Sequence, residues 1–192
     1  MSAAVNLEAR AFEPISGHRA LDLLATLRDR HREPTECLRS PAELDRWLAA
    51  AELEADERAT DGDLEAARRR RETIDSLVRA LLRGRRPRSP DVRELNEWAR
   101  RPGLAPQVSQ TFEQRRTGGP QEALALIARE AVELLGSTDR ALIRECAAAP
   151  ECSRVYLDRS PGGRRRWCHM EWCGSTAKMR RYRRRNSQSP RL

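Results

Sequence analysis

Residues 146–173 read CAAAPECSRVYLDRSPGGRRRWCHMEWC and contain four of the five cysteines of this 192-residue chain. They are Cys146, Cys152, Cys168 and Cys173, which form two close pairs separated by 15 residues. Four thiolates complete the tetrahedral ligand shell of a zinc ion that has a structural role. Residues 146–185 hold few large aliphatic side chains, and a small module without a hydrophobic core of its own needs a metal ion to stabilise its fold. The pattern therefore predicts one structural Zn²⁺ bound by the four cysteines.

Other interpretations of the cysteines stay open at this point. They could be buried free thiols, or a pair of them could form a disulfide. A cluster of cysteines in a chain without a secretory leader favours a metal over disulfides. His169 follows Cys168 and is a further candidate ligand, which the fourth cysteine makes redundant.

The residues around the cysteine pairs predict a strand, a turn, a second strand and a helix. Residues 155–157 are typical of a strand, residues 158–163 of a turn, and residues 164–167 of the returning strand. Residues 174–176 can begin a basic helix directly after Cys173. This order of knuckle, hairpin, knuckle and helix resembles a treble-clef finger.

Positive charge is concentrated in the same part of the chain. Residues 141–192 contain 13 Lys and Arg but four Asp and Glu, so they carry +9, and the whole chain carries +8. A nearly neutral body with a strongly basic end indicates a polyanionic partner for that end. The alternative is a solubilising tail without a partner. The expected nucleic-acid contacts are Lys178, Arg180, Arg181, Arg184 and Arg185 on the helix, and Arg164, Arg165 and Arg166 on the hairpin.

Residues 1–140 predict a mainly α domain, or an α+β domain with at most a small hairpin. Helices are expected over 19–31, from Ser40–Pro41 onward, from Asp61 or Asp63 to Gly84, from Ser89 to about Arg101, over 120–136, and from 138 to Cys146. Residues 104–119 are the β candidate, with a turn at 115–119. We expect this domain to be stable without the finger at 141–185, and residues 186–192 to be disordered.

Polar side chains within the predicted helices give weaker signals. Asp22, Thr26 and Arg30 recur at i, i+4 and i+8 and could line a small ligand pocket, although internal hydrogen bonds are the commoner origin of such a pattern. The run Arg68–Arg71 is expected to be a solvated helix face. The three histidines are scattered, and no nucleotide-binding or hydrolase motif occurs, so we expect no enzyme.

Several short segments are similar to a known family. They are YLDRS at 156–160, RRWC at 165–168, Cys173–Gly174 and, in the body, ALDLLATL at 20–27. With them the chain resembles the bacterial CGNR zinc-finger proteins, whose N-terminal part is the ABATE domain of stress-induced transcription regulators. Ser175–Thr176 stand where the motif of that name has Asn-Arg, and Ala25 stands where the N-terminal signature has Asn.

The resemblance implies a transcription regulator that binds double-stranded DNA through its finger. Its body would be a sensor or an oligomerisation domain, with a small-molecule effector and a homodimer both open. A second interpretation is general nucleic-acid binding, including RNA, because Tyr156, Trp167, Trp172 and Tyr182 could stack on bases. The alternative for the two tryptophans is packing in the finger, and a protein-interaction module is a third interpretation.

The chain shows no feature of a membrane or exported protein. Its first residues lack the basic start and the apolar segment of a signal peptide, and no window approaches about 18 consecutive apolar residues. We therefore expect a cytoplasmic, nucleoid-associated protein without a membrane partner.

Overall fold

The computed structural model describes residues 12–179 and shows a helical body with small antiparallel sheets, as predicted. The helices are α2 (Arg19–Leu24), α3 (Pro41–Ala50), α4 (Asp61–Leu82), α5 (Ser89–Ala99) and α6 (Pro120–Gly136), with a 3-10 turn η1 (Thr138–Leu142) and a π-helical turn η2 (Met170–Gly174). The strands pair as β1 (Leu27–Arg28) with β2 (Thr35–Glu36), β3 (Ala105–Val108) with β4 (Gln114–Thr117), and β5 (Ile143–Glu145) with β6 (Val155–Leu157). Within residues 12–179, no helix is both long and apolar enough to cross a bilayer.

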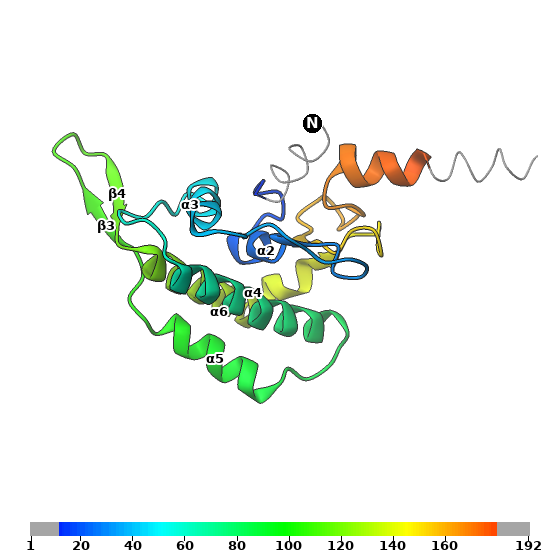
Figure 1. Cartoon of the computed structure of the whole chain (residues 1–192). Coiled ribbons are helices and arrows are strands. Elements are labelled where there is room, and N and C mark those ends of the chain that lie inside the picture. The colour runs from blue at the N-terminus through cyan, green and yellow to red at the C-terminus, as the bar shows by residue number, and fades with distance from the viewer. Residues whose placement is uncertain (1–11, 180–192) are drawn as a thin grey trace, which may run out of the picture.

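The body is built around α4 and α6. These two helices pack against each other and against α5, while α2 contacts both of them from the other side (Figure 1). The centre of the core is formed by large side chains that are at most 1% exposed, namely Leu21, Trp47, Ile74, Leu124 and Ile127. The β3–β4 hairpin and the helical residues 175–179 project from opposite ends of this body (Figure 1).

Local capping signals locate the helix starts. The Ser40 amide donates to the Glu43 carboxylate at 3.0 Å, which completes the predicted capping box of α3. Thr60 is the N-cap of α4, and its amide donates to Asp63 at 2.8 Å. The expected cap at Asp61 or Asp63 is therefore wrong, because Asp63 takes the acidic third position of the box instead.

The expected helix over residues 19–31 is too long. Helix α2 ends at Leu24, and the next residues form β1, which pairs with β2 so that Leu27 lies opposite Glu36. The buried hydroxyl of Thr26 donates to the Leu23 carbonyl oxygen at 2.7 Å and caps the end of the helix. Tertiary contacts thus override the helical spacing of this segment.

The β candidate at residues 104–119 is confirmed as a hairpin, but its turn lies earlier than expected. Val108 pairs with Gln114, so the turn occupies residues 109–113, and residues 115–117 belong to β4. Phe112 adopts a positive φ of 61° in this turn and is 90% exposed. The hairpin is therefore stabilised mainly by its own backbone pairing.

The segment that leads from the helical body into the finger, residues 138–157, differs from the prediction. Instead of a helix that runs from residue 138 to Cys146, η1 is followed by β5, which pairs with β6. Residues 164–167, expected to pair with 155–157, form no strand. Strand β6 is buried along its whole length. On its other edge, the Leu157 amide donates to the Ser16 carbonyl oxygen at 2.9 Å. A strand on the surface of the finger could not make these contacts.

Candidate metal centre and nucleic-acid interface

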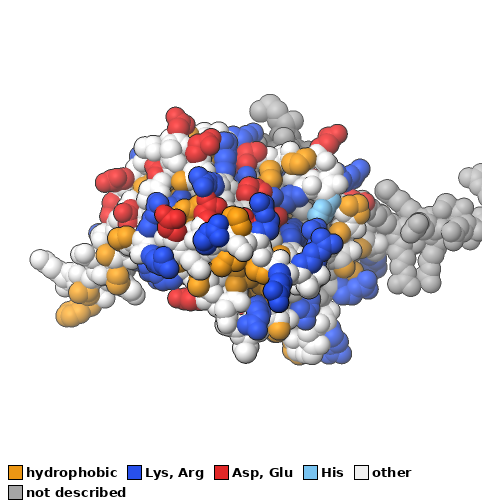
Figure 2. All heavy atoms as spheres, turned by 90° about the horizontal axis from the view of Figure 1, so that it is seen from below, with side chains coloured by type: hydrophobic (Ala, Val, Ile, Leu, Met, Phe, Trp, Pro, Cys, Tyr) orange, Lys and Arg blue, Asp and Glu red, His pale blue; other side chains and the backbone are white. Residues whose placement is uncertain are grey.

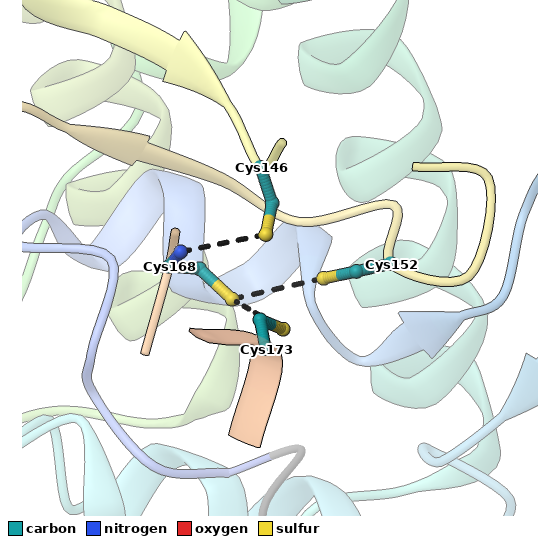
Figure 3. A group of neighbouring side chains, drawn as sticks. All are labelled: Cys146, Cys152, Cys168 and Cys173. Carbon is teal, nitrogen blue, oxygen red and sulfur yellow. Dashed lines mark hydrogen bonds between the residues drawn. The ribbon is translucent and has the colours of Figure 1, made fainter. Parts of the chain in front are cut away.

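Four cysteines from separate segments converge after β5. Cys146 follows that strand, Cys152 precedes β6, Cys168 precedes η2 and Cys173 lies within it. Their Sγ atoms lie within 4.8 Å of one another around one centre (Figure 3). The Sγ–Sγ distances are 3.6 Å for Cys152–Cys168 and 3.5 Å for Cys168–Cys173. Zinc–sulfur bonds of about 2.3 Å in a tetrahedron place sulfurs about 3.8 Å apart, so this cluster fits zinc.

The backbone around the cluster is arranged for thiolate ligands. The Cys168 amide donates to the Cys146 Sγ at 3.5 Å, a contact that favours the charged sulfur (Figure 3). The Cys146 amide donates to the Arg154 carbonyl oxygen at 3.0 Å, and the Cys173 amide to that of His169 at 3.1 Å. Both knuckles are therefore closed by main-chain hydrogen bonds as well as by their ligands.

The electrostatics of the cluster also favour a cation. The pKa of Cys146 is lowered, chiefly by the hydrogen bond from the Cys152 thiol, while the pKa of Cys168 is raised, chiefly by Cys146. A first thiolate thus opposes the loss of further protons from its neighbours. A divalent cation among the sulfurs favours all four thiolates and removes that opposition. The four cysteines form a structural zinc site, as predicted.

His169 lies outside the ligand cluster. Its ring stacks on Trp172 with centroids 4.1 Å apart, and the cluster that could hold a metal consists of the four cysteines. Trp167 packs against the buried residues of the finger. Tyr156 is 1% exposed, so its ring is closed to a stacking base. Of the proposed stacking residues, Tyr182 lies outside the described residues.

Arg165 is used inside the finger. Its guanidinium lies 4.4 Å from the centre of the Tyr156 ring and donates to the carbonyl oxygens of Trp167, at 2.9 Å, and of Cys168. The Tyr156 hydroxyl in turn donates to the Arg165 carbonyl oxygen at 2.6 Å. The expectation that Arg165 lies on an exposed arm is therefore wrong, because the chain here is a loop folded back onto the zinc ligands.

The predicted turn at residues 158–163 orders the start of this loop. Asp158 accepts hydrogen bonds from the Ser160 amide, at 3.0 Å, and hydroxyl, at 2.6 Å. The Ser160 hydroxyl oxygen then accepts the Arg164 amide at 3.0 Å. Gly162 and Gly163 both have positive φ, at 75° and 61°, which explains the glycine pair. The turn leaves the Arg164 side chain on the surface.

The remaining expected nucleic-acid contacts are exposed wherever the structure describes them. Arg164 and Arg166 are exposed, and the Arg166 guanidinium lies 5.1 Å from the centre of the Trp167 ring. Lys178 is exposed on the helical residues 175–179. The other expected contacts, Arg180, Arg181, Arg184 and Arg185, lie outside the described residues, as does the tail at 186–192.

The finger shares its core with the body. Ile143, Val155 and Leu157, from β5 and β6, belong to the same buried cluster as the core of the helices. Arg79 of α4 reaches across and pairs with Glu145 on β5. The packing of the finger strands is therefore continuous with that of the helices.

Asp22, Thr26 and Arg30 do not line a common pocket. Asp22 is buried in α2 and accepts the Ser16 amide at 2.9 Å, and burial raises the pKa of its carboxyl to about 6. Thr26 and Arg30 lie beyond the end of α2, and Arg30 forms an ion pair with Glu72 at 2.7 Å. The expected ligand face is wrong because the helix that defined it ends at residue 24.

Sequence reasoning missed the buried arginines of α4. Arg71 is 3% exposed and donates to Glu36 at 2.7 Å and to the Thr26 hydroxyl at 3.1 Å. Arg70 lies 5.0 Å from the centre of the Trp98 ring, and desolvation lowers its pKa to about 10. The expectation of a solvated face is wrong for both residues. Arg71 also pairs with the adjacent Glu72, but Glu36, Thr26 and Trp98 come from other elements, so no local pattern shows these contacts.

Comparison with known families agrees with this architecture. Residues 17–138 match the ABATE family model, described as "Putative stress-induced transcription regulator", and residues 143–186 match the CGNR zinc finger model. No curated protein matches the chain. The second matched segment contains all four cysteines of the zinc site.

Proposed function

Because the chain belongs to the ABATE family and carries a CGNR zinc finger, we propose that it is a transcription regulator that binds duplex DNA through that finger. One observation carries the proposal. The zinc site holds the start of a helix whose exposed Lys178 is followed in sequence by Arg180, Arg181, Arg184 and Arg185. Neutralisation of phosphates by these cations supplies affinity that falls with salt.

The side chains of Ser175 and Thr176 are used inside the finger, so the cations that follow them are the better candidates for DNA contacts. The Ser175 hydroxyl donates to the Glu171 carbonyl oxygen, and the Thr176 hydroxyl to that of Trp172 at 2.6 Å. Both side chains are thus engaged by the preceding turn. Lys178 and the arginines after it are the groups on this segment that we assign to DNA, with Arg164 and Arg166 as the second choice.

The rest of the proposal follows the family. The protein acts as a binding protein without catalysis of its own, and it resides with the nucleoid. Its helical body carries the regulatory role, with neither an effector nor a second copy assigned to it. RNA is the less favoured partner, because the rings of Tyr156 and Trp167 pack inside the finger.

The test is direct binding by the full-length zinc-loaded protein. Fluorescence anisotropy with a labelled DNA duplex should give binding that weakens steeply between about 50 and 200 mM salt. Selection of bound genomic fragments should then return a repeated site. Binding without any sequence preference would contradict regulation of specific genes, and tighter binding to structured RNA than to duplex DNA would favour the other partner.

A matched pair of variants locates the binding surface. Replacing Lys178, Arg181 and Arg185 by Gln should weaken binding to every sequence and lower the salt slope by about 0.9 per lost contact. The control replaces Arg100, Arg101 and Arg115 by Gln, which removes the same charge from exposed positions at the other end of the body. Equal effects of the two variants would contradict binding through the finger.

A further inference from the structure

The connection between α4 and α5 is the most basic exposed segment of the body. Residues 83–88 read RGRRPR and therefore place four arginines within six residues. All four side chains, Arg83, Arg85, Arg86 and Arg88, are exposed. The near-neutral charge of the body as a whole conceals this local concentration.

Acidic groups of the body do not neutralise these arginines. None of the four forms an ion pair with any residue of 12–179. The nearest acids along α5 have other partners, because Asp91 accepts the Ser76 hydroxyl at 2.6 Å and Glu94 pairs with Arg69. The four guanidinium groups are therefore available to an external anion.

The backbone presents these cations from a defined turn. The Gly84 amide donates to the Leu81 carbonyl oxygen at 3.0 Å, and the Arg85 amide donates to that of Ala80 at 2.8 Å. Gly84 has a φ of +61°, which a glycine adopts without strain, and Pro87 restricts the next part of the chain. A connection held in this way loses less conformational entropy on binding than a free loop.

The basic connection faces the same end of the molecule as the finger. Arg79 contacts Glu145 and the Ser153 carbonyl oxygen, and Arg83, which caps the end of α4, lies one helical turn beyond Arg79. In Figure 1 the α4–α5 connection lies at the end from which the C-terminal helix projects. Figure 2 shows Lys and Arg side chains gathered toward that end of the face, whereas Asp and Glu gather toward the other.

We infer that residues 83–88 form a second DNA-binding surface, which contacts the phosphate backbone of the duplex bound by the finger. This inference rests on the proposed function and extends it from the finger to the body. Phosphate is the fitting partner because the segment offers several guanidinium groups and no stacking aromatic ring. Contacts of this kind add affinity and orient the protein on DNA without reading its sequence.

The experiment compares two variants that each lose four positive charges. In the first, Arg83, Arg85, Arg86 and Arg88 are replaced by Gln. In the control, Arg100, Arg101, Arg115 and Arg116 are replaced, all of which are exposed near the end of α5 or on β4. All eight side chains are exposed, so we expect both variants to keep the far-UV circular dichroism and melting temperature of the wild type.

The readout is the slope of the logarithm of the binding constant against that of salt concentration, for one DNA duplex. The first variant should lose about 2 to 4 units of slope and bind about 100-fold more weakly at about 100 mM salt, while the control changes by less than about one unit. A smaller variant, in which only Arg85 and Arg86 are replaced by Gln, should lose about half as much of the salt slope. It replaces the first variant in the test if the loss of four arginines impairs folding.

The outcomes separate this inference from the proposed function. Binding by the wild type with equal slopes for the first variant and the control overturns the second surface and leaves the finger as the binding site. Loss of slope in the first variant alone supports the second surface. Absence of duplex binding by the zinc-loaded wild type overturns both proposals.

Discussion

Arg79 on α4 donates a hydrogen bond of 2.6 Å to the backbone carbonyl oxygen of Ser153, the residue that follows the zinc ligand Cys152. The same guanidinium pairs with Glu145 on β5 and with Asp75 one turn earlier in its own helix. The longest helix of the body is thereby joined to both sides of the first zinc knuckle. The position of the finger is thus tied to the helical core.

The first prediction concerns this junction. Arg79→Ala should lower the free energy of unfolding by about 2 kcal/mol, because it leaves the buried Ser153 carbonyl oxygen without this donor and two carboxylates without their shared cation. Urea unfolding measures the change. Arg83→Ala, one turn later on an exposed position, is the control and should change it by less than about 0.5 kcal/mol. Equal losses in the two variants would contradict a structural junction.

The second prediction concerns the metal. Protein made without a tag should contain one zinc per chain, and Cys168→Ser should lose it, because Cys168 lies next to two other ligand sulfurs. Elemental analysis of the purified protein measures zinc content. Cys37→Ser provides the control, since Cys37 is buried outside the cluster and the variant should keep its zinc. Full zinc occupancy of Cys168→Ser would argue against a four-cysteine site.

The third prediction concerns the independence of the body. A fragment of residues 1–140 should remain mainly helical, but it should melt at a lower temperature than the whole chain. It lacks Ile143, Val155 and Leu157, which are at most 3% exposed in the shared core, and burial of each contributes about 1.5 to 3 kcal/mol. Circular dichroism during heating measures both properties. An unchanged melting temperature would show that the finger adds nothing to the body.

The fourth prediction concerns pH. Burial raises the pKa of Asp22 to about 6, against opposing hydrogen bonds from Ser16, so the folded state favours the protonated carboxyl. The stability that this provides is complete below the unfolded pKa of about 4 and is lost as pH rises through about 6. Asp22→Asn keeps an acceptor for the Ser16 amide. Relative to wild type, this variant should gain about 2 kcal/mol between pH 4 and pH 8.

The measurement for Asp22 is urea unfolding at both pH values. Glu97→Gln, which changes a charge on the exposed side of α5, is the control for general charge effects. A difference between Asp22→Asn and wild type that stays constant across the pH range would show that Asp22 does not titrate with folding.

Local sequence determined the elements whose signals act within a few residues. The capping box before α3 and the apolar spacing of α4 and α6 involve side chains one helical turn apart, so they can be read along the chain. The turn at residues 158–163 depends on its own Asp, Ser and Gly residues. The four cysteines identify the zinc site by residue type and grouping, because few other arrangements use four clustered thiols.

Tertiary structure decided the features that depend on distant partners. Helix α2 ends early because residues after it pair with β2 and contact Arg71 of α4. Strand β6 pairs with β5, which precedes the first zinc ligand Cys146, since that pairing buries its apolar side chains in the core of the body. Arg165 turns inward because its guanidinium lies over the Tyr156 ring and donates hydrogen bonds to the carbonyl oxygens of Trp167 and Cys168. These pairings depend on burial and on charge between distant elements. Residues that come into contact only in the folded chain produce no periodic pattern along the sequence.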